Sequence, residues 1–235
     1  MKRLLLIALA SAPAMAMTGH GGYGMVMNDN PVVSLVRIDQ LEVAGDGEAR
    51  WEAQAWVGND RDKLWLRSEG ERQAGRLKEG DVEALWYRPF SAFWGRQLGL
   101  RHDIGEGPSR DWLALGVQGL APYWFEVEAT AYAGTEGRSA ARLRAHYDLL
   151  LTQRLILQPE IEGNAYGRAD PERGIGHGLS DARVGLRLRY EIRREIAPYL
   201  GLVQTQRFGD SAELARQAGE PARDTQVVAG LRLWF

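Results

Sequence analysis

Apolar and polar residues alternate along most of this chain, in runs of roughly 10 residues. The last run has Thr225, Val227, Ala229, Leu231, Leu233 and Phe235 at every second position. The run from Asp181 to Ile192 alternates apolar residues with Arg183, Arg187, Arg189 and Glu191. A strand of period two has one set of side chains on each face, whereas a helix needs period 3.6. The pattern therefore predicts an all-β chain whose strands have one apolar and one charged face.

A soluble half-buried sheet shows the same alternation, but two features favour a barrel that crosses a membrane. The charged faces carry arginines and carboxylates in one run after another, as a polar lumen would. Short links, as at residues 58–62 and 120–123, alternate with longer glycine-rich links, as at 70–80, 168–179 and 209–223. We predict a transmembrane antiparallel up-and-down β-barrel of about 12 strands over residues 32–235, with both termini periplasmic and the longer links outside.

Aromatic residues gather near the ends of the runs, where a barrel carries girdles at the membrane surface. They include Trp86, Phe93, Trp112, Trp124 and Phe235. Pro159 falls inside the run 155–166 and cannot donate to a strand ladder, so an interruption is expected there.

The run from Val33 to Val43 does not alternate regularly between apolar and polar residues. If Leu41 and Val43 face lipid, Glu42 faces inward, but a regular strand would turn Asp39 outward. A β-bulge after Ile38 would place both acids in the lumen, and we predict one.

The amino terminus has the layout of a secretory signal peptide. A basic start, Met1–Arg3, precedes the short apolar stretch Leu4–Ala10 and the small residues of Ala14-Met15-Ala16. The apolar stretch is too short to anchor the chain in a bilayer. We expect residues 1–16 to be removed and the mature chain to begin at Met17. The net charge of −2 gives no sign of nucleic-acid binding, and the chain has no cysteine.

Residues 17–31 are predicted to form a flexible segment with metal ligands. Met17, His20, Met25 and Met27 lie among four glycines, and every methionine of the expected mature chain is here. Thioether and imidazole groups suit Cu(I), and imidazole also suits Cu(II). The alternative is a segment with incidental Met and His.

The remaining chemistry lies in the predicted lumen. His146 shares a face with Arg142, Arg144 and Asp148, as a weaker metal ligand or as part of a hydrogen-bonding network. Asp39 and Glu42 are further candidate ligands, although most inward acids are expected to pair with arginines. His102 and Asp103 are the only adjacent acid–histidine pair, and no serine motif accompanies them, so no enzyme is predicted.

The chain resembles the copper resistance protein B family (CopB/PcoB). The resemblance is carried by Asp39–Glu42, Trp56–Asp60, Ser68–Glu71, Gly119–Tyr123, Tyr147-Asp148 with Leu151–Pro159, Gly174–Leu179, Leu186–Ile192 and Ala197–Gly201. It implies an outer-membrane barrel that binds copper or passes it across the outer membrane. It also implies periplasmic copper-resistance proteins, such as a multicopper oxidase, as partners.

The chain departs from this family at one place, because members often carry a longer Met- and His-rich region. Its reduction here to Met17–Met27 favours transient binding over strong sequestration. Our interpretation from the sequence is a non-catalytic copper-homeostasis barrel in contact with outer-membrane lipid. The alternative is a general small-solute porin without metal specificity.

Overall fold

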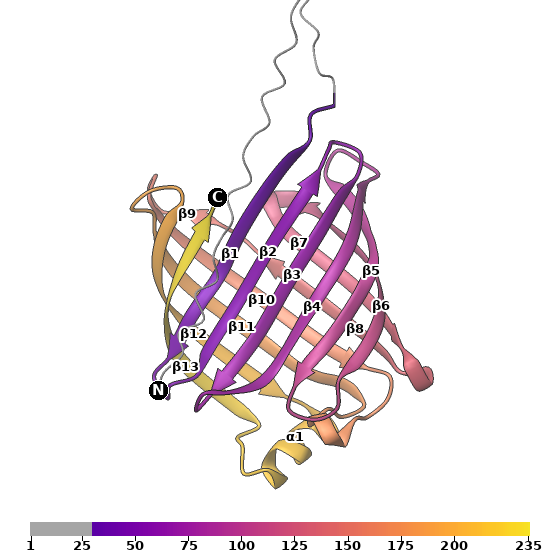
Figure 1. The fold of residues 1–235 in the computed structure, drawn as a ribbon. Coiled ribbons are helices and arrows are strands. Elements are labelled where there is room, and N and C mark those ends of the chain that lie inside the picture. Colours follow the sequence, from indigo (N-terminus) through magenta and orange to yellow (C-terminus); the bar gives the residue numbers. More distant parts are fainter. Residues whose placement is uncertain (1–29) are drawn as a thin grey trace, which may run out of the picture.

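The structure is a computed structural model that describes residues 30–235 (Figure 1). Its strands are β1 Val33–Ala44, β2 Ala49–Gly58, β3 Lys63–Gln73, β4 Arg76–Pro89, β5 Trp94–Gly105, β6 Arg110–Ala121, β7 Phe125–Gly134, β8 Ser139–His146, β9 Leu149–Leu150, β10 Leu155–Tyr166, β11 Gly178–Tyr190, β12 Ile196–Arg207 and β13 Arg223–Trp234. One α-helix, α1, spans Gly209–Gln217. The predicted signal peptide and Met/His segment up to residue 29 lie outside the described residues.

The strands close into an antiparallel barrel. From β1 to β8 and from β10 to β13 each strand pairs with the next along the chain, and β13 returns to pair with β1. Strands β8 and β9 both pair with β10 and together fill one position, interrupted at Tyr147 and Asp148. The 13 strand segments therefore make 12 strand positions, which confirms the predicted fold class and strand count.

Apolar side chains cover the outer surface of the barrel. Leu100, Leu115 and Leu200 are 65%, 61% and 64% exposed, and they are typical of many outward aliphatic residues. A soluble monomer rarely exposes so much contiguous apolar surface, whereas the outside of a barrel in lipid does. Closure leaves no unpaired strand edge in the hydrocarbon, where an unsatisfied peptide group is costly. No helix among residues 30–235 is long and apolar enough to span a membrane.

The predicted bulge is present in β1. The register of β1 with β2 and with β13 shifts after Ile38, so Asp39 is an extra residue in the strand. As a result Asp39, Gln40 and Glu42 all face the lumen, while Leu41 is half exposed on the outside. Both acids are therefore inside, as the parity argument requires.

The expected interruption at Pro159 falls on the neighbouring strand instead. Strand β10 is continuous through Pro159, which pairs with Leu186 of β11. On its other side the ladder breaks between β8 and β9, where the Tyr147 amide donates to the Pro159 carbonyl over 3.1 Å. Proline has no N–H to offer that neighbour, so the neighbour loses its pairing while β10 stays extended.

The barrel has two distinct mouths. At the terminal mouth, where β1 begins and β13 ends, Val36 and Phe235 exchange backbone hydrogen bonds of 2.8 and 3.0 Å. At the opposite mouth lie the two longest links among residues 33–235, 167–177 and 208–222, the second of which contains α1 (Figure 1).

The prediction of a long loop at residues 70–80 is wrong. Strands β3 and β4 extend to Gln73 and Arg76, and only Ala74 and Gly75, with φ of 50° and 81°, make the turn. Positive φ at both central residues is typical of a tight hairpin. Gly70 instead makes room for the Trp51 ring, whose atoms would lie 2.3 Å from a Cβ there. Marked alternation of link length is thus confined to the last three links, where the short link 191–195 lies between the long links 167–177 and 208–222.

One member of the predicted aromatic girdle also lies elsewhere. Trp112 is 6% exposed and packs inside the barrel with Leu85, Ala114 and Tyr132. Its indole N–H donates to Asp103 over 2.8 Å, so the ring fills the lumen near the opposite mouth rather than meeting lipid headgroups.

Candidate functional site

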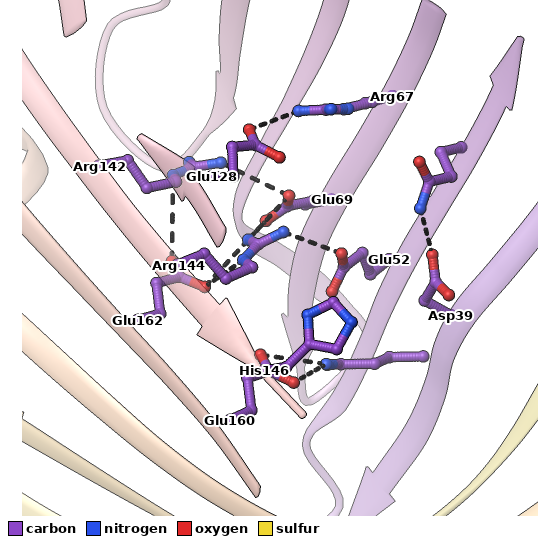
Figure 2. A network of polar contacts seen from close by, with 12 residues as sticks. Asp39, Glu52, Arg67, Glu69, Glu128, Arg142, Arg144, His146, Glu160 and Glu162 are labelled. Atoms are coloured by element: carbon purple, nitrogen blue, oxygen red, sulfur yellow. Dashed lines mark hydrogen bonds and ion pairs between the residues drawn. The ribbon is translucent and has the colours of Figure 1, made fainter. Parts of the chain in front are cut away.

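A network of ion pairs crosses the middle of the lumen. The guanidinium of Arg144 on β8 lies 2.9 Å from each of Glu52, Glu69 and Glu162, which come from β2, β3 and β10 (Figure 2). Arg142, two residues earlier on the same face, reaches Asp81 at 3.2 Å and Glu69 at 3.5 Å. Alternation along each strand points these side chains inward, and mutual pairing offsets the cost of removing them from water.

Two smaller ion-pair clusters lie beside this network. Arg187 on β11 contacts Glu42 at 3.0 Å and Glu160 at 2.9 Å, and the Tyr199 hydroxyl donates to Glu42 over 3.1 Å. Arg67 on β3 pairs with Glu128 of β7 at 2.5 Å. Salt bridges and hydrogen bonds therefore join strands on opposite sides of the barrel, and the lumen is filled with polar contacts at this depth.

A cavity of about 260 Å³ lies between this network and the terminal mouth. Its lining includes Asp39, Lys63, Trp65, Tyr87, Glu126, His146 and Glu160. Toward the opposite mouth, a cavity around Trp112 and Tyr132 inside the barrel measures only about 10 Å³. The open part of the lumen is therefore in the half that contains both ends of the barrel chain.

His146 and Asp39 both line this cavity, as their shared inward orientation predicts. His146 Nε2 lies 3.3 Å from a Glu126 carboxylate oxygen, and Asp39 pairs with Arg37 at 2.7 Å. Glu42 is elsewhere, held by Arg187 and Tyr199. Across residues 30–235, no group of three or more His, Asp or Glu side chains is arranged to hold a metal ion. Met17, His20, Met25 and Met27 lie outside the described residues.

A set of inward charged residues on β3 and β4 was not predicted from the sequence. They are Arg67, Glu69, Glu71, Asp81 and Glu83, and each is buried. The predicted loop at 70–80 contained Glu71 and cut short the two alternating runs that carry the other four. The signal was available, since Leu64 and Leu66 alternate with Trp65 and Arg67 in a pattern that continues without a break to Glu71.

The pair His102 and Asp103 is divided by the barrel wall. His102 faces outward and its Nδ1 lies 2.6 Å from Asp111, whereas Asp103 faces inward and binds Arg101 at 2.6 Å. Adjacent residues of a strand point to opposite faces. The two side chains therefore do not form an acid–histidine pair.

The opposite mouth carries a clasp of charged residues. Asp170, in the link 167–177, accepts hydrogen bonds from Arg110 at 2.9 Å and from Arg138. Glu220, in the link 208–222, pairs with Lys78 at 2.9 Å and Arg207 at 2.7 Å. Ser211 of α1 accepts a bond of 2.7 Å from the Gly176 amide, which ties the two links together.

Burial alone would raise the pKa of Asp170, but the hydrogen bonds and positive charges of Arg110 and Arg138 outweigh it and hold that pKa below its ordinary value. Burial would also raise the pKa of Glu220, but the hydrogen bonds and positive charges of Lys78 and Arg207 outweigh it. The pKa of Glu220 is therefore lowered. Both carboxylates are therefore ionised at neutral pH and hold the two links against the barrel.

The closed barrel, its apolar outer surface and its charged lumen define an outer-membrane β-barrel protein. Residues 32–235 match the family described as copper resistance protein B precursor (CopB). The chain belongs to this family, and its location is the outer membrane. Family membership links it to copper resistance.

Named relatives agree with this assignment. The chain is 46% identical over 221 residues to the copper resistance protein B homolog of Pseudomonas syringae pv. tomato, covering 93% of this chain and 74% of that protein. It is 42% identical over 215 residues to copper resistance protein B of Escherichia coli, covering 90% and 73%.

Solved structures share the fold. The KdgM porin aligns with a TM-score of 0.55 at 14% identity, over 86% of this chain and 99% of that one. The NanC porin aligns with a TM-score of 0.54 at 10% identity, again over 86% and 99%. At these identities the likeness concerns the barrel alone.

Proposed function

We propose that this protein binds copper at the terminal mouth and passes it across the outer membrane as part of copper homeostasis. The observation that carries the proposal is family membership over residues 32–235, the whole of the barrel. The cavity at the terminal mouth supports it, because an imidazole and carboxylates line the wall there. Copper is the cargo, and the barrel carries no catalysis in this proposal.

First contact is assigned to Met17, His20, Met25 and Met27. Thioether groups favour Cu(I), and His20 accepts either oxidation state. Strand β1 begins at Val33 beside the last residues of β2, at the mouth that leads to the cavity. Copper released from these ligands would therefore reach the cavity without crossing the barrel wall.

Within the barrel the proposed contacts are His146 and Asp39, with Glu42 further along β1. These acids are engaged by Arg37 and Arg187, at 2.7 and 3.0 Å, so copper must compete with arginine for them. Weak binding of this kind suits passage rather than storage, since a conducted ion must also leave. A periplasmic multicopper oxidase is the kind of partner that would supply or accept copper at this mouth.

The general porin remains the second candidate, supported by the barrel fold shared with the KdgM porin. The ion-pair network centred on Arg144 opposes it, because the network occupies the lumen of the barrel. Planar-bilayer recordings separate the two proposals. A general porin conducts chloride and small sugars freely, whereas a copper-handling barrel with this network shows low conductance.

Copper titration of three variants in neutral detergent tests the proposed function. Changing His20, Met25 and Met27 together to alanine should weaken Cu(I) binding about tenfold or more, since it removes three of the four proposed ligands. His146→Ala should have a smaller effect. His177→Ala is the matched control, because this histidine is exposed in the link at the opposite mouth. Parent-like copper binding by both the triple variant and His146→Ala would contradict the proposal.

A further inference from the structure

We propose that the terminal mouth contains a binding site for a small organic anion with a ring-shaped face, formed by Lys63, Trp65 and Tyr87. All three side chains line the cavity of about 260 Å³. Lys63 and Trp65 alternate onto the inner face of β3, and Tyr87 is the direct partner of Lys63 on β4. The three groups thus form one patch of wall beside the turn that joins β2 to β3.

Lys63 differs from the other cations of this cavity in having no carboxylate partner within residues 30–235. Arg37 and Arg232 pair with Asp39 at 2.7 and 3.4 Å, Arg67 with Glu128 at 2.5 Å, and Arg144 with Glu52 at 2.9 Å. The Lys63 ammonium instead lies 4.4 Å from the centroid of the Trp56 ring and 5.9 Å from that of Tyr87.

The acids that line the same cavity are already engaged. Asp39 is held by Arg37, Glu52 and Glu69 by Arg144, Glu126 by His146, Glu128 by Arg67 and Glu160 by Arg187. Lys63 is therefore the one charged side chain of this lining that has no oppositely charged neighbour among the described residues. An ammonium without a partner in a partly enclosed site favours an anion, most strongly one that accepts its hydrogen bonds directly.

Aromatic rings beside the ammonium add a flat apolar surface. Trp65 lies 5.9 Å from Tyr87 and 6.3 Å from Trp56, between ring centroids. The indole N–H of Trp65 is buried and has no hydrogen-bond partner within the described barrel. Buried donors are normally satisfied, so an orphan donor beside a cavity indicates a group that is supplied from outside.

Together these features select a ligand with one carboxylate and one ring. The carboxylate pairs with Lys63, and the ring packs against Trp65 and Tyr87, as flat groups do on aromatic faces. The cavity is smaller than sites for drug-sized ligands, which measure roughly 300–1,000 Å³, so a single ring is the expected size. A sugar acid and an aromatic acid share this chemistry. None of these features depends on copper, so the site can be tested independently of the proposed function.

Saturation-transfer NMR on the copper-free barrel in neutral detergent tests the site with four probes. Benzoate has a carboxylate and an aromatic ring, glucuronate has a carboxylate and a sugar ring, acetate lacks the ring and glucose lacks the charge. We expect benzoate or glucuronate to bind at least about fivefold more tightly than acetate and glucose. Binding of benzoate alone identifies an aromatic acid, and binding of glucuronate alone a sugar acid. Binding of neither overturns the proposal.

Variants locate the binding. Lys63→Gln and Trp65→Leu should each weaken the better probe about fivefold or more, while Lys63→Arg, which keeps the charge, should retain it. Arg88→Gln is the matched control, because Arg88 lies 5.9 Å from the Trp86 ring on the other face of β4 at the same mouth. Heat-modifiable migration verifies folding. Unchanged binding by Lys63→Gln, or an equal loss with Arg88→Gln, overturns the proposal.

Discussion

At the scale of single residues, Arg144 joins three other strands across the lumen. Its guanidinium lies 2.9 Å from carboxylates on three other strands, and its side chain is 11% exposed. A guanidinium has five donors in a planar fork and keeps its charge when buried, whereas an ammonium offers a single point charge. This difference explains why the barrel interior uses arginine at such junctions. The two lysines of the described residues, Lys63 and Lys78, lie toward the mouths.

Arg144→Gln should therefore lower the free energy of unfolding by about 3–5 kcal/mol, because Glu52, Glu69 and Glu162 would keep buried charge without this cation. Urea unfolding of the barrel in lipid vesicles measures the change. Arg88→Gln serves as the control, with an expected effect of less than about 1 kcal/mol, since its ion pair with Asp62 is exposed. A loss for Arg144→Gln as small as for the control would show that the network does not stabilise the barrel.

Residue parity predicted some of the site and missed the rest for a physical reason. The lumen position of His146, Asp39 and Glu42 could be predicted from the sequence. The alternation of apolar and polar residues along each strand shows which face of the sheet a side chain is on, once the bulge in β1 is allowed for. The distances between them were not predictable, since parity says nothing of depth or of which strands lie across the lumen. For this reason the sequence did not show that Glu42 pairs with Arg187 instead of lining the cavity that contains His146.

At the scale of elements, the links at the opposite mouth form a clasped cap. Asp170 joins the link 167–177 to the first residue of β6 through Arg110, and to the residue before β8 through Arg138. Glu220 joins the link 208–222 to β4 through Lys78. Sequence composition indicated these two links but also a third at 70–80, because glycine marks both loops and places where a ring needs room.

The clasp should respond to acid in a defined direction. Arg110 and Arg138 hold the pKa of Asp170 below its ordinary value against the effect of burial, so the carboxylate contributes stability above its unfolded pKa of about 3.9. That contribution is lost only as the pH falls through the lower folded value. Hydrogen exchange of residues 167–177, corrected for intrinsic rate, should be unchanged from about pH 8 to 5 and should rise below about pH 4.

Asp170→Asn removes the charge that both arginines share, so exchange in this link should be fast at every pH tested. Glu172→Gln is the control, because the Glu172 side chain is 73% exposed and its ion pair with Arg110, at 3.5 Å, is longer than that of Asp170. Protection that is lost between pH 8 and 5, or retained in Asp170→Asn, would show that other contacts hold the link.

At the scale of the whole molecule, closure of the barrel determines where the two ends of the barrel chain lie. Pairing of β13 with β1 brings both ends of the barrel to one mouth, and an even number of strand positions makes this necessary in an up-and-down barrel. Alternation and an even count were enough to predict this from sequence. The filled lumen was not predictable, because it depends on side chains from β3, β7, β8 and β10 that meet only after closure.

The terminal mouth should face the periplasm, because bacterial barrels carry their longer links outside and the two longest described links are at the opposite mouth. The chain has no cysteine, so labelling of a single introduced cysteine shows on which side of the membrane that position lies. Arg216→Cys, exposed on α1, should react with a membrane-impermeant maleimide on intact cells. Asp60→Cys, exposed in the turn between β2 and β3, should react only after the outer membrane is permeabilised. The reverse pattern would place the cavity outside the cell, and copper would then have to be captured from the medium rather than from the periplasm.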